Sequence, residues 1–383
     1  MEFGIFVQGH VPKARVEREG HAAEHNALMA DIECIKAADR NGWKYAWVSE
    51  HHFLTEYSHL SASDVFLGYC AAVTDRIHLG SGIFSFNPHK DHPGRIAERV
   101  AMLDHLSDGR FEFGTGRGAG SREVTGWDIE STEQTRAIWD EVIREIPKMW
   151  RDEEYSYEGT SFNMPFPGDR IPTRNVLPKM WKQSHPPMWV AAGNPGTYVK
   201  AAQMGLGVLA FNVSAVKDMA PLVASYKDNI GDAVPVGDYV NDNVMLTNGL
   251  VCLADGQKAR EAATNMGVSY LQSQVFYYHD TMPTPEGIPV WPEPFPEPTL
   301  EDIEYRIQEG YLLCGSPDEV VEQVARYQDL GIDQLVFGMP LDLPLEQALE
   351  TIELFGQHVI PQFDTSPDTF RSDGFRYGTV GTA

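Results

Sequence analysis

The sequence alternates along most of its length between short apolar segments typical of strands and amphipathic segments typical of helices. A helical pattern follows each of the strand-like segments, which are residues 2–8, 45–49, 77–86, 111–114, 188–192, 207–211, 244–253 and 334–337. Regular alternation of this kind predicts a parallel sheet covered by helices, because parallel strands need a crossover between them. Eight units favour an α/β fold of the closed (β/α)8 TIM-barrel type.

The alternative α/β arrangement is an open, doubly wound sheet that binds a dinucleotide. Such a sheet carries a Gly-x-Gly-x-x-Gly motif between its first strand and first helix. The first strand-like segment is not followed by this motif, and the glycine-rich run at residues 114–120 has a different spacing. The sequence therefore favours the barrel.

Two irregular stretches interrupt the alternation. Residues 151–187 are rich in proline and aromatic residues, with a short hairpin expected near residues 155–162. Residues 276–299 contain seven prolines, which a regular helix or a central strand would not tolerate. We therefore expect one barrel domain over residues 1–363 with insertions at 151–187 and 276–299. The polar residues 364–383 are expected to form a C-terminal tail.

Charge and composition exclude several classes of partner. The 383 residues include 30 basic and 55 acidic side chains, a net charge of −25, which disfavours binding to nucleic acid or to an anionic membrane. No apolar run approaches the roughly 18–20 residues of a membrane span, and no signal-peptide pattern is present. The four cysteines form no Cys-x-x-Cys pair, so we expect buried, reduced thiols in a cytoplasmic protein.

A histidine follows the second predicted strand, at the end of a barrel where active sites lie. The segment reads Ser-Glu-His-His-Phe and places Glu50 or His51 at the barrel mouth. A histidine there can act as a general base near neutral pH, although a purely structural histidine fits the same pattern. A metal site is disfavoured because adjacent strand residues point apart, so no metal ion is expected.

Three further strand ends carry glycine-rich loops. Residues 80–87 could approach a flat ligand closely, and residues 114–120 place Arg117 among small residues that suit a phosphate. Residues 193–197 lead into a helix, whose N-terminus favours anions. Each loop could instead serve only packing or chain reversal. Two such loops on neighbouring strands together favour a phosphorylated cofactor.

These segments resemble those of the bacterial luciferase-like flavin monooxygenases. The resemblance rests on Phe3-Gly4-x-Phe6, WVSEHHF at residues 47–53, Leu79-Gly80-Ser81-Gly82, His92-Pro93, LDHLSDGRFEFGTGRG at residues 103–118, and Trp189-Val190-Ala191. It implies a TIM barrel that binds reduced FMN, activates O2 as a flavin C4a-peroxide and inserts one oxygen atom into a substrate.

The resemblance also assigns individual residues. It implies that His51 is catalytic and that Gly116 and Arg117 bind the cofactor, Arg117 through its phosphate. It further implies cofactor contacts for the loop after the fifth predicted strand (residues 188–192), at Gly193, Asn194, Gly196 and Thr197. The flavin ring would lie over Gly82 and Ile83, near an expected non-prolyl cis peptide bond. Candidates for the wall of a mostly apolar substrate pocket are Phe6, Gln8, Phe84 and Phe86.

Two positions depart from the luciferases themselves. Gly116 stands where they carry a reactive cysteine, and Gly193 stands where they carry an acidic residue. Light emission is therefore not implied.

The expected enzyme is a two-component monooxygenase, because the sequence shows no nicotinamide-binding motif and a separate flavin reductase would have to supply reduced FMN. Two alternatives remain open. One is a deazaflavin-dependent oxidoreductase that transfers hydride on the same barrel, and the other is a flavin-binding protein without catalysis. The resemblance further implies a homodimer or a higher homo-oligomer. Residues 276–299 could be an active-site lid or a subunit contact.

Overall fold

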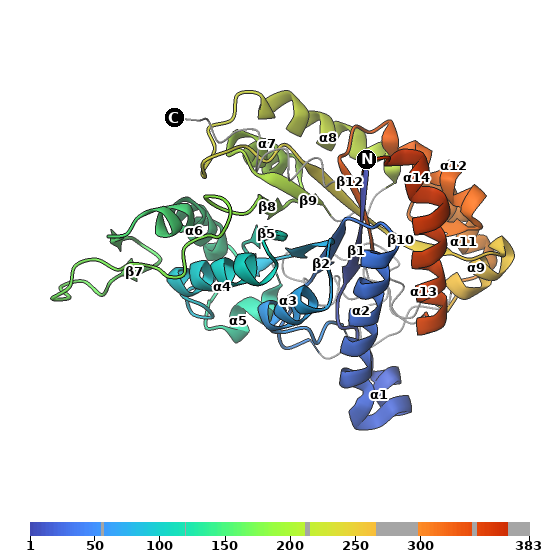
Figure 1. The fold of residues 1–383 in the computed structure, drawn as a ribbon, viewed down its shortest axis with the longest axis horizontal. Helices are drawn as coiled ribbons and strands as arrows, with labels where there is room; N and C mark the ends of the chain where they lie inside the picture. Colours follow the sequence, from blue (N-terminus) through green and yellow to red (C-terminus); the bar gives the residue numbers. More distant parts are fainter. Residues whose placement is uncertain (55–56, 119, 211–214, 266–297, 339–342, 367–383) are drawn as a thin grey trace.

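The computed structural model describes residues 1–54, 57–118, 120–210, 215–265, 298–338 and 343–366 (Figure 1). Eight parallel strands close into a barrel, in the order β10-β12-β1-β2-β3-β5-β8-β9, and the β9–β10 pairing completes the ring. These strands are β1 (Glu2–Val7), β2 (Tyr45–Val48), β3 (His78–Ser81), β5 (Phe111–Gly116), β8 (Met188–Ala191), β9 (Gly207–Ala210), β10 (Val244–Cys252) and β12 (Gln334–Gly338). The predicted TIM barrel is confirmed, and all eight predicted strands contribute to it.

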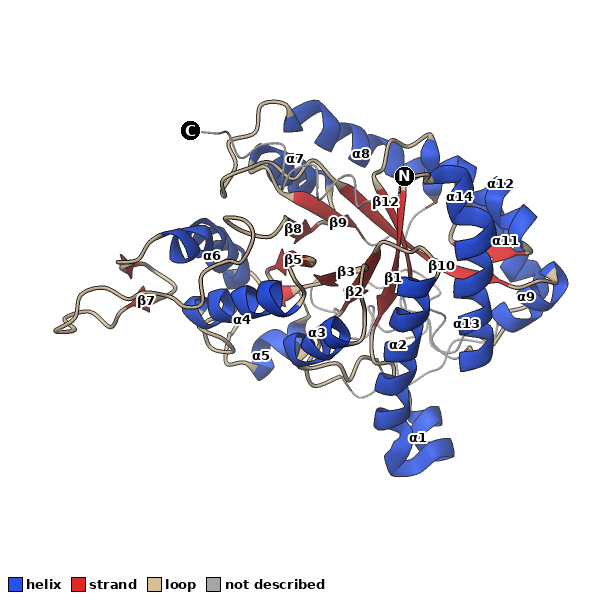
Figure 2. Ribbon diagram, in the orientation of Figure 1, coloured by secondary structure: helices blue, strands red, loops and turns tan. Residues whose placement is uncertain are grey.

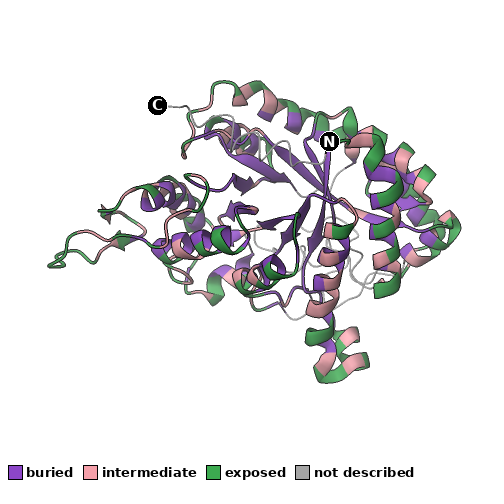
Figure 3. Cartoon of the chain, in the orientation of Figure 1, coloured by how far each residue is buried: buried purple, intermediate pink, exposed green. Residues whose placement is uncertain are grey.

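Helices surround the barrel (Figure 2). The longer ones are α2 (Ala23–Arg40), α3 (Ser63–Ala72), α4 (Pro93–Leu106), α6 (Gln134–Arg151), α7 (Pro195–Gln203), α8 (Val216–Ile230), α9 (Gly256–Ala263), α11 (Leu300–Glu309), α12 (Pro317–Gln328) and α13 (Leu345–Leu354). Shorter ones are α1 (Lys13–Glu19), η1 (Gly20–Ala22), α5 (Ser121–Gly126), η2 (Phe355–Val359) and α14 (Ile360–Phe363). Buried residues line the sheet and the inner faces of the helices (Figure 3). No helix in the described ranges combines the length and apolarity needed to cross a membrane.

Two elements differ from the prediction. The predicted strand at residues 77–86 ends at Ser81, and a separate two-residue strand, β4 (Phe84–Ser85), then pairs with β5. A further strand, β11 (Leu312–Gly315), was not predicted. It pairs with the second half of β10, beyond the part of β10 that joins the barrel, so it lies beside the closed ring.

The first insertion contains the predicted hairpin. Its two strands, β6 (Tyr157–Glu158) and β7 (Asn163–Met164), pair antiparallel on an arm that projects from the barrel in Figure 1. Most of the second insertion and most of the tail, at residues 276–297 and 367–383, lie outside the described residues.

Two tryptophans fill the inside of the barrel. Trp47 and Trp189 meet edge to face with ring centroids 5.2 Å apart, among other buried residues of the inner faces. A side chain at Gly80 or Gly207 would collide with one of these indoles, so glycine is required where the strands face them. The filled barrel leaves its mouth, at the carboxyl ends of the strands, as the place for chemistry. All four cysteines are free and buried, as predicted.

Candidate active site

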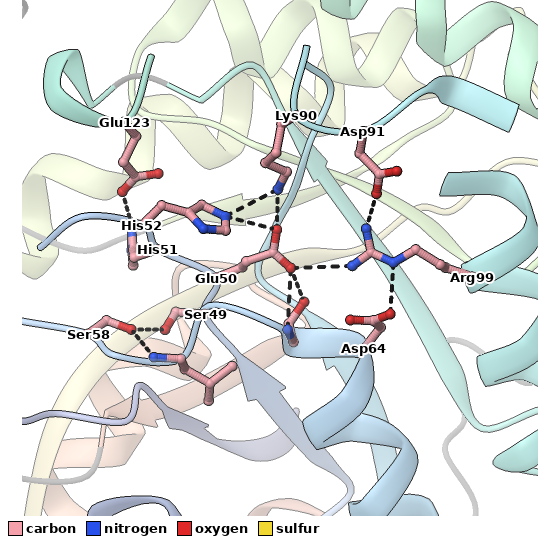
Figure 4. A network of polar contacts seen from close by, with 12 residues as sticks. Ser49, Glu50, His51, His52, Ser58, Asp64, Lys90, Asp91, Arg99 and Glu123 are labelled. Atoms are coloured by element: carbon pink, nitrogen blue, oxygen red, sulfur yellow. Dashed lines mark hydrogen bonds and ion pairs between the residues drawn. The ribbon is translucent and has the colours of Figure 1, made fainter. Parts of the chain in front are cut away.

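A buried carboxylate holds the segment that follows β2 (Figure 4). Glu50 accepts a hydrogen bond of 2.5 Å from the Ser63 hydroxyl and forms an ion pair with Lys90. Arg99 approaches the same carboxylate at 3.7 Å and also binds Asp64 and Asp91. The Glu50 side chain is only 2% exposed. Four segments, namely the end of β2, the start of α3, the loop before α4 and α4 itself, are thereby fixed around one charge.

The cationic neighbours decide the ionisation of Glu50. Burial by itself would raise the pKa of this carboxyl. The hydrogen bond with His52, the Lys90 ammonium and the Ser63 hydroxyl together outweigh burial and hold the pKa well below its usual value. Glu50 is therefore ionised at neutral pH and acts as a fixed anion beside the barrel mouth.

His51 is paired with a second carboxylate. Its Nδ1 lies 2.6 Å from Oε1 of Glu123 in α5, and both side chains are largely buried. Because a carboxylate can only accept, the pairing assigns the proton to Nδ1 and leaves Nε2 as the atom that can take up another proton. The Tyr57 ring packs against the imidazole, with centroids 5.1 Å apart. An imidazole held in this way has the geometry that a general base requires.

Gly82, Ile83 and Gly116 come together at the mouth. A side chain at Gly116 would overlap Ile83, and one at Gly82 would come within 3.0 Å of the Phe6 ring. The same Gly116 position lies 3.7 Å from Ala191 of β8. The ends of β1, β3, β5 and β8 thus form a floor of small and apolar groups. The Ile83 side chain fills the space beside Gly116 and is itself only partly buried, so it presents an apolar surface at the mouth.

Arg117 lies at the edge of a polar cavity of about 330 Å³ between α5 and the start of α6. One guanidinium nitrogen donates to the Thr132 carbonyl oxygen at 3.0 Å. The lining residues are Arg117, Ser121, Thr125, Glu130, Ser131, Thr132, Glu133 and Arg136. Two guanidinium groups and four hydroxyls are the donors that a phosphate requires, and Glu130 and Glu133 are exposed. The donor set therefore fits the phosphate of FMN.

The loop after β8, which leads into α7, has a different environment. Asn194 caps α7, and its side chain accepts the Thr197 N–H at 3.1 Å. Gly193 is exposed, with no atom within 4 Å of the place a side chain would take. Gly193, Asn194, Gly196 and Thr197 do not line the Arg117 cavity, although β5 and β8 are neighbours. The two predicted anion loops therefore share one end of the barrel without forming one cavity.

Phe84 and Phe86 lie away from Phe6 and Gln8. Both are buried in the core between sheet and helices, where their rings contact Phe113 at centroid distances of 5.9 and 6.1 Å. The Arg99 guanidinium also covers the Phe84 ring. These two phenylalanines thus pack the scaffold behind the site, whereas Phe6 packs inside the barrel.

The prediction of a non-prolyl cis peptide bond near Gly82 and Ile83 is wrong. The cis bonds of the described residues precede Pro165 and Pro178.

Glu123 is the site residue that the sequence did not reveal. It lies 72 positions from His51 on a helix of only six residues. On the same helix, Ser121 and Thr125 line the Arg117 cavity. Helix α5 thus connects the candidate phosphate site to the candidate base. The only sequence signal was the glycine run before it, which indicated a loop.

Comparison with known proteins matches residues 1–334 to the family described as luciferase-like monooxygenase. The oxygenase component of the flavin-dependent trigonelline monooxygenase of Acinetobacter baylyi is 24% identical over 379 residues, covering 96% of each chain. The 5,10-methylenetetrahydromethanopterin reductase of Methanopyrus kandleri is 27% identical over 352 residues, covering 86% of this chain and 93% of the reductase.

A solved structure shows the same fold. The oxygenating constituent of 3,6-diketocamphane monooxygenase from Pseudomonas putida, a type II Baeyer–Villiger monooxygenase in complex with FMN, superimposes with a TM-score of 0.73. It is 18% identical to this chain and covers 94% of it, with 98% of its own length matched. At this identity the likeness concerns the fold.

Proposed function

Because the chain belongs to the luciferase-like monooxygenase family, we propose that it is the oxygenase component of a two-component system. It would use reduced FMN from a separate reductase, together with O2, to oxygenate a small and mostly apolar organic molecule. The observation that supports this proposal is the His51–Glu123 pair, in which His51 would act as an oriented base at the mouth of the barrel. The trigonelline relative, named as an oxygenase component, supports the two-component arrangement.

Each part of the cofactor would have its own contacts. Arg117 and the hydroxyls of its cavity would hold the phosphate, and the floor of Gly82, Ile83 and Gly116 would lie against the flavin ring. The start of α7 would add the partial positive charge of a helix N-terminus. Reduced FMN supplies the electrons that activate O2 when it is bound.

His51 would move a proton during the reaction. Nε2 can take up a proton and return it, while Glu123 holds the ring and stabilises the charged imidazolium. The buried network around Glu50 keeps the backbone of residues 49–52 in one position. The site we propose thus combines a cofactor platform with one oriented base, in a domain spanning residues 1–363 and acting in the cytoplasm.

Cofactor binding tests the proposal. The purified protein is expected to bind reduced FMN, and Arg117→Ala is expected to weaken this binding about 10- to 100-fold, because charge-assisted hydrogen bonds contribute roughly 1.5–3 kcal/mol. Anaerobic titration followed by flavin absorbance measures both affinities. Arg95→Ala on α4 is the matched control, since Arg95 pairs only at the surface with Glu98.

The second candidate function is hydride transfer with a deazaflavin. It is favoured by the similarity to the reductase of Methanopyrus kandleri, at an identity comparable to that of the oxygenase relative. Tight binding of the deazaflavin coenzyme F420 without measurable affinity for reduced FMN would replace the first proposal by this one.

We further propose a homodimer formed through α3 and α4. The outward face of α3 carries Val65 and Tyr69, and Val73 follows its last turn. Met102 and Leu106 extend this apolar surface on α4. Val65→Glu is expected to convert the dimer to a monomer, because it buries an unpaired charge in the interface. Sedimentation equilibrium measures the mass. Val234→Glu is the control, at a residue that is 80% exposed on another surface. A monomeric wild type, or a Val65→Glu variant that remains dimeric, would contradict this interface.

A further inference from the structure

Helix α5 carries Glu123, the partner of His51, yet it is too short to hold its own position. It has six residues, and isolated helices shorter than about 12–15 residues are only marginally stable in water. The position of the Glu123 carboxylate therefore depends on the contacts that hold α5 against the rest of the barrel.

An aromatic residue at the end of α5 provides such a contact. Trp127 directly follows the helix, and its backbone N–H donates to the Glu123 carbonyl oxygen at 3.1 Å. Because the two residues are four positions apart, their side chains lie on the same side of the helix, one turn from each other. A contact that fixes the Trp127 indole thus also fixes the Glu123 carboxylate.

Two rings of the segment after β2 pack against the Trp127 indole. The His52 ring meets it edge to face with centroids 5.2 Å apart, and the centroid of the Phe53 ring lies at 5.1 Å. His52 is itself held by the buried network, since its Nε2 lies 3.4 Å from Glu50 Oε1 and from Lys90 Nζ (Figure 4). The network that fixes the backbone after β2 therefore extends to the end of α5.

Phe53 has a backbone conformation that bulky residues rarely adopt. Its φ is +63°, in the left-handed region, where a side chain crowds its own backbone. The ring lies directly against the backbone of α5, because a side chain at Gly126 would come within 2.6 Å of two of the ring carbons. Phe53 is 54% exposed, so burial of apolar surface accounts for only part of this arrangement. Strained residues of this kind persist where the surrounding contacts enforce them, and they cluster at active sites.

We propose that Phe53 is a positioning residue for the histidine at the barrel mouth. Its ring holds α5 in place through Gly126 and Trp127. The helix held in this way keeps the Glu123 carboxylate on Nδ1 of His51, so that Nε2 stays free of a proton. The effect on catalysis rests on the proposed oxygenase function, whereas the position of the proton on His51 is a property of the chain without flavin.

The tautomer of His51 provides the first test. The full chain is labelled with 15N-histidine, and the shifts of the ring nitrogens are recorded without flavin at alkaline pH, where imidazoles are neutral. Loss of signals in His51→Ala identifies the His51 ring. Wild type is expected to carry the proton on Nδ1, because a carboxylate can only accept. Phe53→Ala is expected to lose this preference and to show protonated Nε2 as well.

Substitutions at the same position separate the ring from the backbone. Phe53→Tyr keeps the ring and is expected to keep the proton on Nδ1. Phe53→Gly removes the ring while relieving the left-handed backbone, and it is expected to behave like Phe53→Ala. Phe166→Ala, at a phenylalanine of the first insertion that is 79% exposed, is the matched control and is expected to leave the tautomer unchanged.

Double-mutant kinetics provide the second test. Phe53→Ala is expected to lower kcat about tenfold with KM unchanged, the same loss as Glu123→Gln. The variant that combines both substitutions is expected to lose about tenfold as well, instead of about 100-fold, because residues that act through one contact are not additive.

Four results would overturn the role of Phe53. They are a wild-type His51 with its proton on Nε2, an unchanged tautomer in both Phe53→Ala and Phe53→Gly, losses in kcat that multiply in the double variant, and a change in KM alone, which would make Phe53 a substrate contact. The first result does not depend on how well any variant folds. The tautomer measurement needs no oxygenase activity, so this inference and the oxygenase proposal can fail separately.

Discussion

Replacement of His51 by alanine is expected to lower substrate oxygenation by about 10²- to 10⁴-fold, the usual contribution of a positioned general acid or base. The reason is geometric, because the Glu123 pairing leaves Nε2 as the only ring atom that can exchange a proton at the barrel mouth. Affinity for reduced FMN is expected to stay near that of wild type, since the proposed phosphate contacts come from Arg117 and its cavity. Product formation is measured on a substrate found by screening for compounds that stimulate oxidation of reduced FMN.

Two companion variants separate catalysis from structure. Glu123→Gln keeps the size of the side chain and no longer fixes the imidazole as a carboxylate does. We expect kcat to fall about tenfold with KM unchanged, because a hydrogen bond to a neutral amide is weaker than one to a carboxylate by roughly 1 kcal/mol. His105→Ala, on the exposed side of α4, is the matched histidine control and is expected to leave kcat unchanged. Full oxygenation by His51→Ala would remove the catalytic assignment, and a change in KM alone for Glu123→Gln would make Glu123 a binding residue.

The barrel could be predicted because its signal is local. A short apolar run indicates each strand. Apolar residues at helical spacing indicate each helix, such as α2. The strand β11 escaped prediction because its four residues lie directly between two helices and pair outside the closed ring. His51 was also accessible, since the position of a residue at a strand end follows from the strand itself.

The pocket assignments show where local reasoning fails. A continuous strand over residues 77–86 would place Phe84 and Phe86 on the same face as Gly80 and Gly82, which point into the barrel. The strand instead ends at Ser81 and resumes as β4 beside β5, so the two rings turn outward into the core. The two-residue break between β3 and β4 thus reverses the face on which Phe84 and Phe86 lie.

Contacts between residues far apart in the sequence could not be predicted either. Glu123 and Lys90 reach the segment after β2 from residues far along the chain, and no spacing in the sequence connects them. The charges around Glu50 are fixed only by the way α4 and the loop before it pack against β2. These long-range contacts have the largest expected effect on stability.

Glu50→Gln is expected to lower the free energy of unfolding at pH 7 by about 3–5 kcal/mol, the cost of removing one partner from a buried ionic network. The carboxylate is 2% exposed, and its loss leaves Lys90 unneutralised and weakens the surroundings of Arg99. Urea unfolding followed by tryptophan fluorescence measures the difference. Glu98→Gln is the matched control, because Glu98 pairs with Arg95 at the surface and exposed pairs contribute only about 0–1 kcal/mol.

The dependence of folding stability on pH tests the role of the Glu50 charge in a second, independent way. The pKa of Glu50 in the folded chain lies below its usual value of 4.5, so the unfolded chain binds a proton more readily. The stabilisation is therefore fully present above pH 4.5 and is lost as the pH falls below it. Wild type is expected to lose stability steeply on acidification, and Glu50→Gln is expected to lose less over the same interval. Equal acid slopes, together with a difference below about 1 kcal/mol at pH 7, would show that Lys90 and Arg99 are stabilised without Glu50.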